Sequence, residues 1–176
     1  VGRFQVQKNH QAIVQIFNEV QKIMPTARLC LVGDGELKEK IREELQQLGI
    51  LQKVIFAGVC PDVERYLSAM DVFLFPSLFE GLPFTLLEAQ ANGLPCVVSD
   101  RITEEAVITE KIISRLSLER SDEEWASAVI AAAKKGREDK EAAVRAIGMA
   151  HFDIHQEAGR LLELYEKQGE KHGKQN

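Results

Sequence analysis

Short apolar runs alternate with longer segments that are apolar on one side only, and this alternation constrains the fold more than any other feature. The runs lie at 28–32, 54–58, 71–75 and 95–98, and 112–118 fits one more. Strands of a parallel sheet with helices on both faces have this composition. The pattern therefore predicts an α/β fold built on a doubly wound parallel sheet.

The intervening segments carry apolar residues at helical spacing. In 10–24 the predicted buried face consists of Ile13, Ile16, Phe17, Val20 and Ile23. The same spacing predicts helices over 37–48, 63–70 and 84–91. A capping box at 121–124 predicts another helix, with Trp125 packed against the core. The last helical face consists of Ile154, Ala158, Leu161, Leu162 and Tyr165. We expect one domain over 1–168 and a polar, disordered tail over 169–176.

The charge of the chain limits which partners it can bind, and its cysteine content indicates its cellular compartment. The chain has 22 Lys and Arg against 27 Asp and Glu, a net charge of −5, whereas a surface that coats nucleic acid needs a basic excess. Cys30, Cys60 and Cys96 form no CxxC pair, so we expect reduced, buried thiols in a cytoplasmic protein. No apolar stretch approaches the ~20 residues of a membrane span. The start at Val1, without Met, suggests a piece of a longer protein.

Two carboxylates, Glu80 and Glu88, lie eight residues apart across a turn that leads into the predicted helix 84–91. Pro83 suits the first helical position, because its φ angle is already helical. The amides that would then be unpaired belong to Phe84, Thr85 and Leu86. Such a helix start favours a bound phosphate, with a carboxylate at either side. Taken alone, two glutamates around a helix start more often belong to a solvated first turn than to a binding site.

The surroundings of these glutamates resemble the signature of glycogen-synthase-like, group 1 retaining glycosyltransferases, which have the GT-B fold. The signature is Glu80-x7-Glu88, preceded by Pro76-Ser77 and followed by Ala-Gln-Ala-Asn-Gly-Leu-Pro at 89–95. Further matches are Val1-Gly2-Arg3 with Lys8, Val32-Gly33-Asp34-Gly35 and Val54-Ile55-Phe56-Ala57-Gly58. The similarity runs in order over about residues 1–100, and 152–165 resembles the closing helix. It implies the Rossmann-like C-terminal half of a GT-B enzyme of the capsular and exopolysaccharide branch.

The resemblance also implies a role for each matching position. Glu80 would bind hydroxyls of the donor sugar and Glu88 those of the ribose, while Arg3 and Lys8 would neutralise the diphosphate leaving group. The other implied donor-binding residues are Gly33, Asp34, Gly35, Gly58, Val59, Gly81, Leu82, Phe84 and Thr85. We expect no metal, since the chain has no Asp-x-Asp pair, and no cofactor besides the donor substrate itself.

The intact enzyme would then transfer a sugar, of hexosyl type, from a nucleoside diphosphate to a saccharide or lipid-linked acceptor in polysaccharide biosynthesis. Uridine is the base that the resemblance implies. The acceptor would bind a missing N-terminal domain, without which the fragment is expected to be inactive. Peripheral membrane association through that half stays open. So do two alternative functions: a binding module that recognises a nucleotide sugar without transferring it, and a nucleotide-sugar epimerase of the GT-B fold.

Two positions depart from the family pattern. Asn9 stands where the family commonly has glycine, directly after the lysine that Lys8 matches. Arg101-Ile102-Thr103 precede Glu104 and Glu105, where the family usually has paired glycines ahead of another glutamate. The second departure falls on the loop expected next to the donor sugar.

Overall fold

The structure, a computed structural model, describes residues 1–173, with side chains up to residue 165. Its strands are β1 (Leu29–Val32), β2 (Val54–Gly58), β3 (Phe73–Phe75), β4 (Cys96–Ser99) and β5 (Ile113–Leu116). Its α-helices are α1 (His10–Ile23), α2 (Lys38–Gln47), α3 (Val63–Ala69), α4 (Phe84–Ala91), α5 (Asp122–Lys135), α6 (Lys140–Ile147) and α7 (Ile154–Gly173). A 3-10 turn, η1 (Val6–Lys8), precedes α1.

Every strand pairing in the described residues is parallel, which confirms the predicted α/β class. The strands form two hydrogen-bonded groups, β1-β2 and β3-β4-β5. Leu29 is in register with Val54 in the first group, and Phe73 with Cys96 in the second. The two groups share one core, because Leu31 of β1 and Val97 of β4 belong to the same buried cluster.

Helix α1 packs against α5 beside the first strand pair. It buries the predicted face of Ile13, Ile16, Phe17 and Val20, but Ile23 is 61% exposed because the helix ends at that residue. The capping box between Ser121 and Glu124 begins α5 as predicted. Trp125 is buried, and its indole N–H donates to the Ser117 carbonyl.

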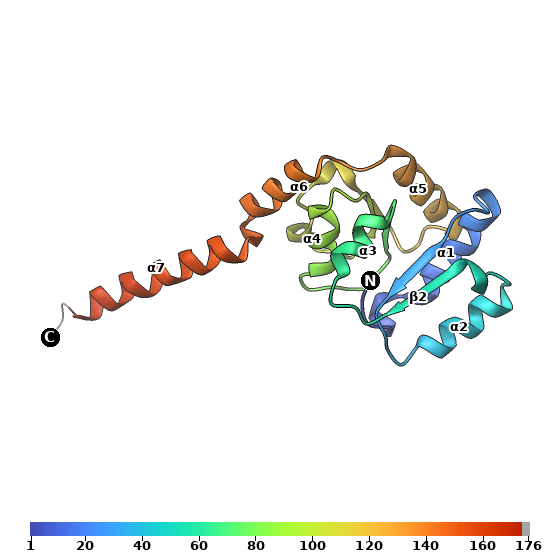
Figure 1. Ribbon diagram of the computed structural model, residues 1–176, viewed down its shortest axis with the longest axis horizontal. Helices are drawn as coiled ribbons and strands as arrows, with labels where there is room; N and C mark the ends of the chain where they lie inside the picture. Colours follow the sequence, from blue (N-terminus) through green and yellow to red (C-terminus); the bar gives the residue numbers. More distant parts are fainter. Residues whose placement is uncertain (174–176) are drawn as a thin grey trace.

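The C-terminal part departs most from the sequence-based expectation. Helix α6, which the apolar spacing did not indicate, packs against α4. A kink over Gly148–Phe152, where His151 has a φ of 70°, leads into α7. Figure 1 shows α7 projecting from the body, so the apolar face predicted for it is exposed up to Tyr165. Since α7 runs to Gly173 and 174–176 lie outside the described residues, the boundary at 168 stays a prediction.

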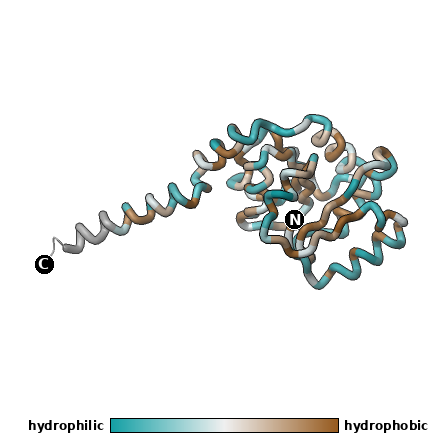
Figure 2. Tube along the Cα trace, in the orientation of Figure 1, coloured by the Kyte–Doolittle hydropathy of each residue, from teal (hydrophilic) through white to brown (hydrophobic). Residues whose placement is uncertain are grey.

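The apolar residues concentrate in the strands and the polar ones on the outer helices, as Figure 2 shows along the trace. Cys96 is fully buried as expected. The expectation was wrong for Cys30 and Cys60, which are half-buried: Cys30 lies on a strand pair only partly covered, and Cys60 lies in the loop after β2. Within residues 1–173, no helix is long and apolar enough to span a membrane.

Candidate functional site

Three of the predicted site residues, Gly33, Gly58 and Glu80, lie at or just after the carboxyl ends of β1, β2 and β3. There the N-terminal segment crosses the end of β1: the Gly2 amide donates to the Val32 carbonyl at 2.9 Å, and the Phe4 amide to the Asp34 carbonyl at 2.9 Å. The same segment reaches the loop after β3, where the Leu78 amide donates to a carbonyl of η1 at 2.9 Å. Ligands of open α/β sheets bind at this edge.

Gly33 and Gly35 serve this crossing directly. A Cβ atom at Gly33 would lie 2.0 Å from the Gly2 carbonyl oxygen, and one at Gly35 would lie 2.6 Å from that of Phe4. Both glycines also have a φ that side-chain-bearing residues rarely adopt, +131° and +159°. The missing side chains therefore make room for the segment that carries Arg3, whereas the resemblance implied that they admit the nucleotide.

Lys8 and Glu80 form the centre of the site. The Lys8 ammonium pairs with Glu80 Oε1 at 2.7 Å and lies 4.9 Å from the centre of the Phe75 ring. The second carboxylate oxygen of Glu80 accepts from the Gln7 side-chain amide at 3.2 Å. The Glu80 side chain is 7% exposed and that of Lys8 19%. Two residues that the sequence separates by 72 positions thus share one charged contact.

Asn9, the first departure from the family pattern, occupies a left-handed backbone conformation with a φ of 52°. Asparagine is one of the few residues besides glycine that adopt this region readily. Its side-chain amide also donates to the Pro76 carbonyl at 3.1 Å. Asn9 therefore supplies the backbone conformation that a glycine would supply and adds a bond to the loop after β3.

The start of α4 offers unpaired polar groups, although fewer than expected. Pro83 lies one position before the helix and not, as the sequence predicts, at its first position. Its carbonyl accepts a hydrogen bond from the Leu86 amide at 2.9 Å, so the prediction that this amide is unpaired is wrong. Within the described residues the amides of Phe84 and Thr85 have no partner. The buried hydroxyls of Ser77 and Thr85 have none either. Unpaired buried hydroxyls are costly in a folded protein, and the described residues have further unpaired buried atoms away from α4, at Thr109 and Glu138.

Glu88, which the resemblance implies for the other end of the site, lies on α4 in a different environment. Its side chain is exposed and has no hydrogen bond or ion pair in the part of the chain that is described. Partial burial raises the pKa of its carboxyl. The residue borders a cavity of about 520 Å³ between α3, α4 and α6, lined also by 61–65, Asn92 and Lys140. Sequence reasoning missed the α6 side of this cavity, because α6 itself was not foreseen.

The remaining predicted residues surround the site with less definite contacts. Arg3 is exposed and its side chain has no partner within residues 1–165. Gly58 accepts from the Gly33 amide at 2.7 Å. Asp34 already has a partner within the chain. It forms an ion pair with Lys38 at 3.0 Å, and this bond lowers the pKa of the Asp34 carboxyl. The exposed rim of the site consists of Val59, Gly81, Leu82 and Phe84.

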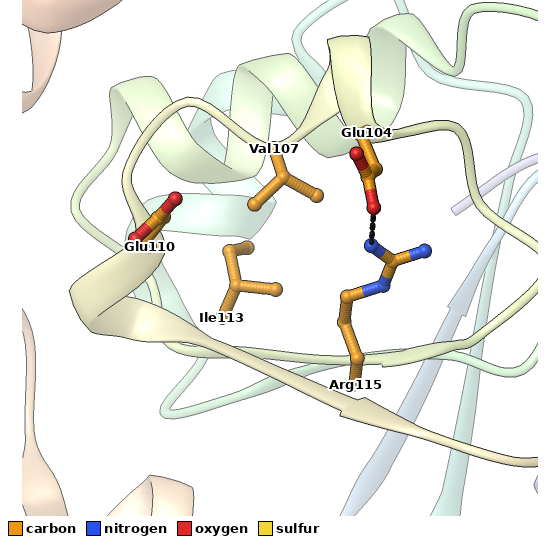
Figure 3. A pocket seen from close by; sticks show the side chains of 5 residues that line it. All are labelled: Glu104, Val107, Glu110, Ile113 and Arg115. Atoms are coloured by element: carbon orange, nitrogen blue, oxygen red, sulfur yellow. Dashed lines mark ion pairs between the residues drawn. The ribbon is translucent and has the colours of Figure 1, made fainter.

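The loop after β4, the second departure from the pattern, is held by side chains. Arg115 donates to the carbonyls of Asp100 at 3.2 Å and Ile102 at 2.8 Å and pairs with Glu104 at 3.6 Å. Figure 3 shows the Arg115–Glu104 pair at one side of a cavity of about 300 Å³. On the buried side of this loop, the Gln90 side-chain amide donates to the Ala106 carbonyl at 2.7 Å. Nothing in the sequence indicated these two anchoring residues.

Comparison with known proteins decides the family. A family model described as "Glycosyl transferases group 1" matches residues 1–135. The chain belongs to this family. As a group 1 glycosyltransferase sequence it is 37% identical over 171 residues to a Bacillus subtilis (strain 168) protein named "Putative glycosyltransferase EpsF", a match that spans 97% of this chain and 44% of the relative.

A second relative is the Escherichia coli enzyme named UDP-Gal:alpha-D-GlcNAc-diphosphoundecaprenol alpha-1,3-galactosyltransferase. It is 36% identical over 103 residues, which are 57% of this chain and 27% of that enzyme. Among solved structures, Anabaena HepE in complex with UDP superimposes with a TM-score of 0.75 at 17% identity, covering 94% of this chain and 47% of HepE. This group 1 chain has the C-terminal GT-B fold and spans less than half the length of these relatives.

Proposed function

We propose that this chain is the nucleotide-sugar-binding domain of a retaining glycosyltransferase that acts on a nucleoside-diphosphate sugar. The observation that carries the proposal is the Lys8–Glu80 pair at 2.7 Å, beside the unpaired amides of Phe84 and Thr85. Together they put a cation, a carboxylate and free N–H donors within one edge of the sheet. A sugar diphosphate requires donors for its phosphates and acceptors for its hydroxyls.

The leaving group is the nucleoside diphosphate, which gains negative charge as its bond to the sugar breaks. We assign the stabilisation of that charge to Lys8 and Arg3. The Phe84 and Thr85 amides at the start of α4 add fixed dipoles. Glu80 accepts hydrogen bonds from the sugar, and Glu88 from the ribose. We propose that Arg3 and Lys8 supply this stabilisation without a metal ion.

A UDP-hexose is the proposed donor. In support, HepE is described in complex with UDP, and the Escherichia coli relative is named for transfer from UDP-Gal. That relative's name also includes a diphosphoundecaprenol acceptor, in keeping with a saccharide or lipid-linked acceptor in polysaccharide biosynthesis. We place the reaction in the cytoplasm, because the three cysteines are free thiols.

We further propose that the acceptor binds a separate N-terminal domain. The relatives are more than twice as long as the segment they share with this chain, which covers 44% of one and 27% of the other. Transfer needs the acceptor oxygen about 3–3.5 Å from the anomeric carbon and water excluded from the cleft. The isolated chain should therefore bind donor without transferring sugar. Acceptor-dependent product from the chain alone would contradict this division.

The direct test is an NMR titration of the chain with UDP. Because one face of the ligand remains in water, we expect a dissociation constant in the micromolar to millimolar range, about −8 to −4 kcal/mol. Amide shifts should concentrate at Gly33, Gly58 and 84–88. Saturating UDP without shifts at these positions overturns the proposed function. An assay of the full-length enzyme with donor but no acceptor distinguishes an epimerase, which would still convert the donor.

A further inference from the structure

We propose that Gln7 is a positioning residue that sets the orientation of the Glu80 carboxylate toward the donor sugar. This inference rests on the proposed function. The family resemblance gives Gln7 no role, and the residue lies on the turn η1 between Gln5 and Lys8. Its backbone carbonyl and its side-chain amide nevertheless both bond to the loop that carries Glu80.

Gln7 contacts the Glu80 loop at three consecutive residues. Its carbonyl accepts from the Leu78 amide at 2.9 Å. Its side-chain amide donates to the Phe79 carbonyl at 3.0 Å and to Glu80 Oε2 at 3.2 Å. An amide nitrogen has two N–H groups, so both are used on this loop. The side chain therefore ties the carboxylate to the backbone that carries it.

The contribution of Gln7 differs from that of Lys8. Lys8 bonds Oε1, which fixes one oxygen but leaves the carboxylate plane free to turn about that contact. The bond from Gln7 to Oε2 removes this freedom. Because the amide is neutral, the carboxylate keeps the charge that strengthens its hydrogen bonds to sugar hydroxyls. A second cation at the same place would reduce that charge.

The test is a comparison of sugar-dependent affinity. Calorimetry of the chain with UDP, UDP-glucose, UDP-galactose and UDP-N-acetylglucosamine gives, for each sugar, the affinity gained over UDP. In Gln7→Met this gain should fall by about 3- to 10-fold, the effect of one or two lost hydrogen bonds, while UDP affinity stays within 2-fold. Gln7→Asn keeps an amide but shortens its reach, so it should likewise lower the affinity gained from the sugar while leaving UDP affinity within 2-fold. Gln11→Met, on the exposed face of α1, is the matched control.

A double-mutant cycle separates positioning from a general effect on the fold. In the Glu80→Ala background, Gln7→Met should cause no further loss of sugar-dependent affinity. An additive loss there, or an equal loss for UDP and UDP-sugars, overturns the positioning role while the proposed function stands. Wild-type affinity that is the same for UDP and all three sugars overturns the roles of both Glu80 and Gln7. Absence of UDP binding overturns the proposed function, and the inference with it.

Discussion

Glu80 and Glu88 lie eight residues apart in one short stretch, yet the structure surrounds them differently. Glu80 is nearly buried and bonds through both oxygens, to Lys8 at 2.7 Å and to Gln7 at 3.2 Å. Glu88 is exposed at the edge of a cavity of about 520 Å³. Its carboxylate has no side-chain partner among the residues described.

The difference shows that the chain itself holds the Glu80 carboxylate in place but does not hold the Glu88 carboxylate. At the Glu80 end the chain's own cation and amide already hold the carboxylate, so little order remains to be imposed by a ligand. At the Glu88 end the carboxylate has no side-chain partner among the described residues, and partial desolvation raises the pKa of its carboxyl. Under the proposed function Glu80 binds the sugar and Glu88 the ribose, so we expect the Glu80 end to provide selectivity and the Glu88 end to provide affinity.

The largest effect is expected from the cations of the Glu80 end. In the full-length enzyme, Arg3→Ala and Lys8→Ala should each lower kcat by about 10²–10³-fold, the usual loss when a donor to developing charge is removed. Lys8→Ala should also weaken UDP-sugar binding, because Glu80 loses its ion-pair partner. Arg3→Ala should not have this second effect, because Arg3 forms no ion pair with Glu80. Initial rates with a radiolabelled donor measure this. Lys22→Ala, on α1, serves as the control, and a loss under 3-fold in both variants would refute the roles.

Replacing Glu80 and Glu88 separately tests whether the two carboxylates contribute to the binding of different parts of the donor. Glu88→Ala should weaken UDP and UDP-sugars alike, by about 1.5–3 kcal/mol if its bonds to the ribose are charge-assisted. Glu80→Ala should leave UDP affinity almost unchanged and weaken only the sugar-bearing donors. Calorimetry with both ligand types measures the difference. Equal losses of UDP affinity in the two variants would mean that the two ends are not functionally distinct.

Acid should destabilise the fold through His10 at the start of α1, whose ring packs against Phe4 with centroids 4.6 Å apart. Burial lowers the pKa of His10 from 6.5 to about 4, and the N-terminal ammonium adds to this. His10 is therefore neutral in the fold, and its contribution to stability is fully present above pH 6.5 and is lost as pH falls toward 4.

Between pH 7.5 and 5 the loss should be about 2 kcal/mol, from 1.36 kcal/mol per pH unit below the unfolded pKa. Urea unfolding at the two pH values measures it. His10→Gln should flatten the profile relative to the wild-type chain, because glutamine gains no proton between pH 7.5 and 5. If the wild-type chain and the His10 variant have the same pH profile, the buried neutral state of His10 is wrong.

The smallest effect concerns Asn9, which joins η1 to the loop that carries Glu80. Asn9→Ala and Asn9→Gly both lose the bond to the Pro76 carbonyl, but only alanine is strained at a φ of 52°. Asn9→Ala should be less stable than Asn9→Gly by roughly 1 kcal/mol. Thermal unfolding compares the pair directly. Indistinguishable midpoints would show that the left-handed conformation is not maintained in solution.

Much of the fold was predictable from local sequence. The apolar run at 54–58 and the helical spacing at 84–91 predicted β2 and α4 with the observed bounds, because a short apolar run and a one-sided helical pattern differ in the sequence. Helix α6 was not predicted, since its packing surface is α4. The exposure of α7 was not predicted either, because an apolar face predicts burial without showing what covers it.

The sequence by itself determined which residue types are available: the Glu80-x7-Glu88 spacing, Arg3, Lys8 and the run of elements that carry them. Only the tertiary structure decided that Lys8 meets Glu80, that Gln7 joins them, and that Gly33 and Gly35 make room for the segment around Arg3. The physical reason is that local propensity and apolar periodicity act over a few residues. Contacts across 72 positions depend on how parallel strands bring their carboxyl ends to one edge.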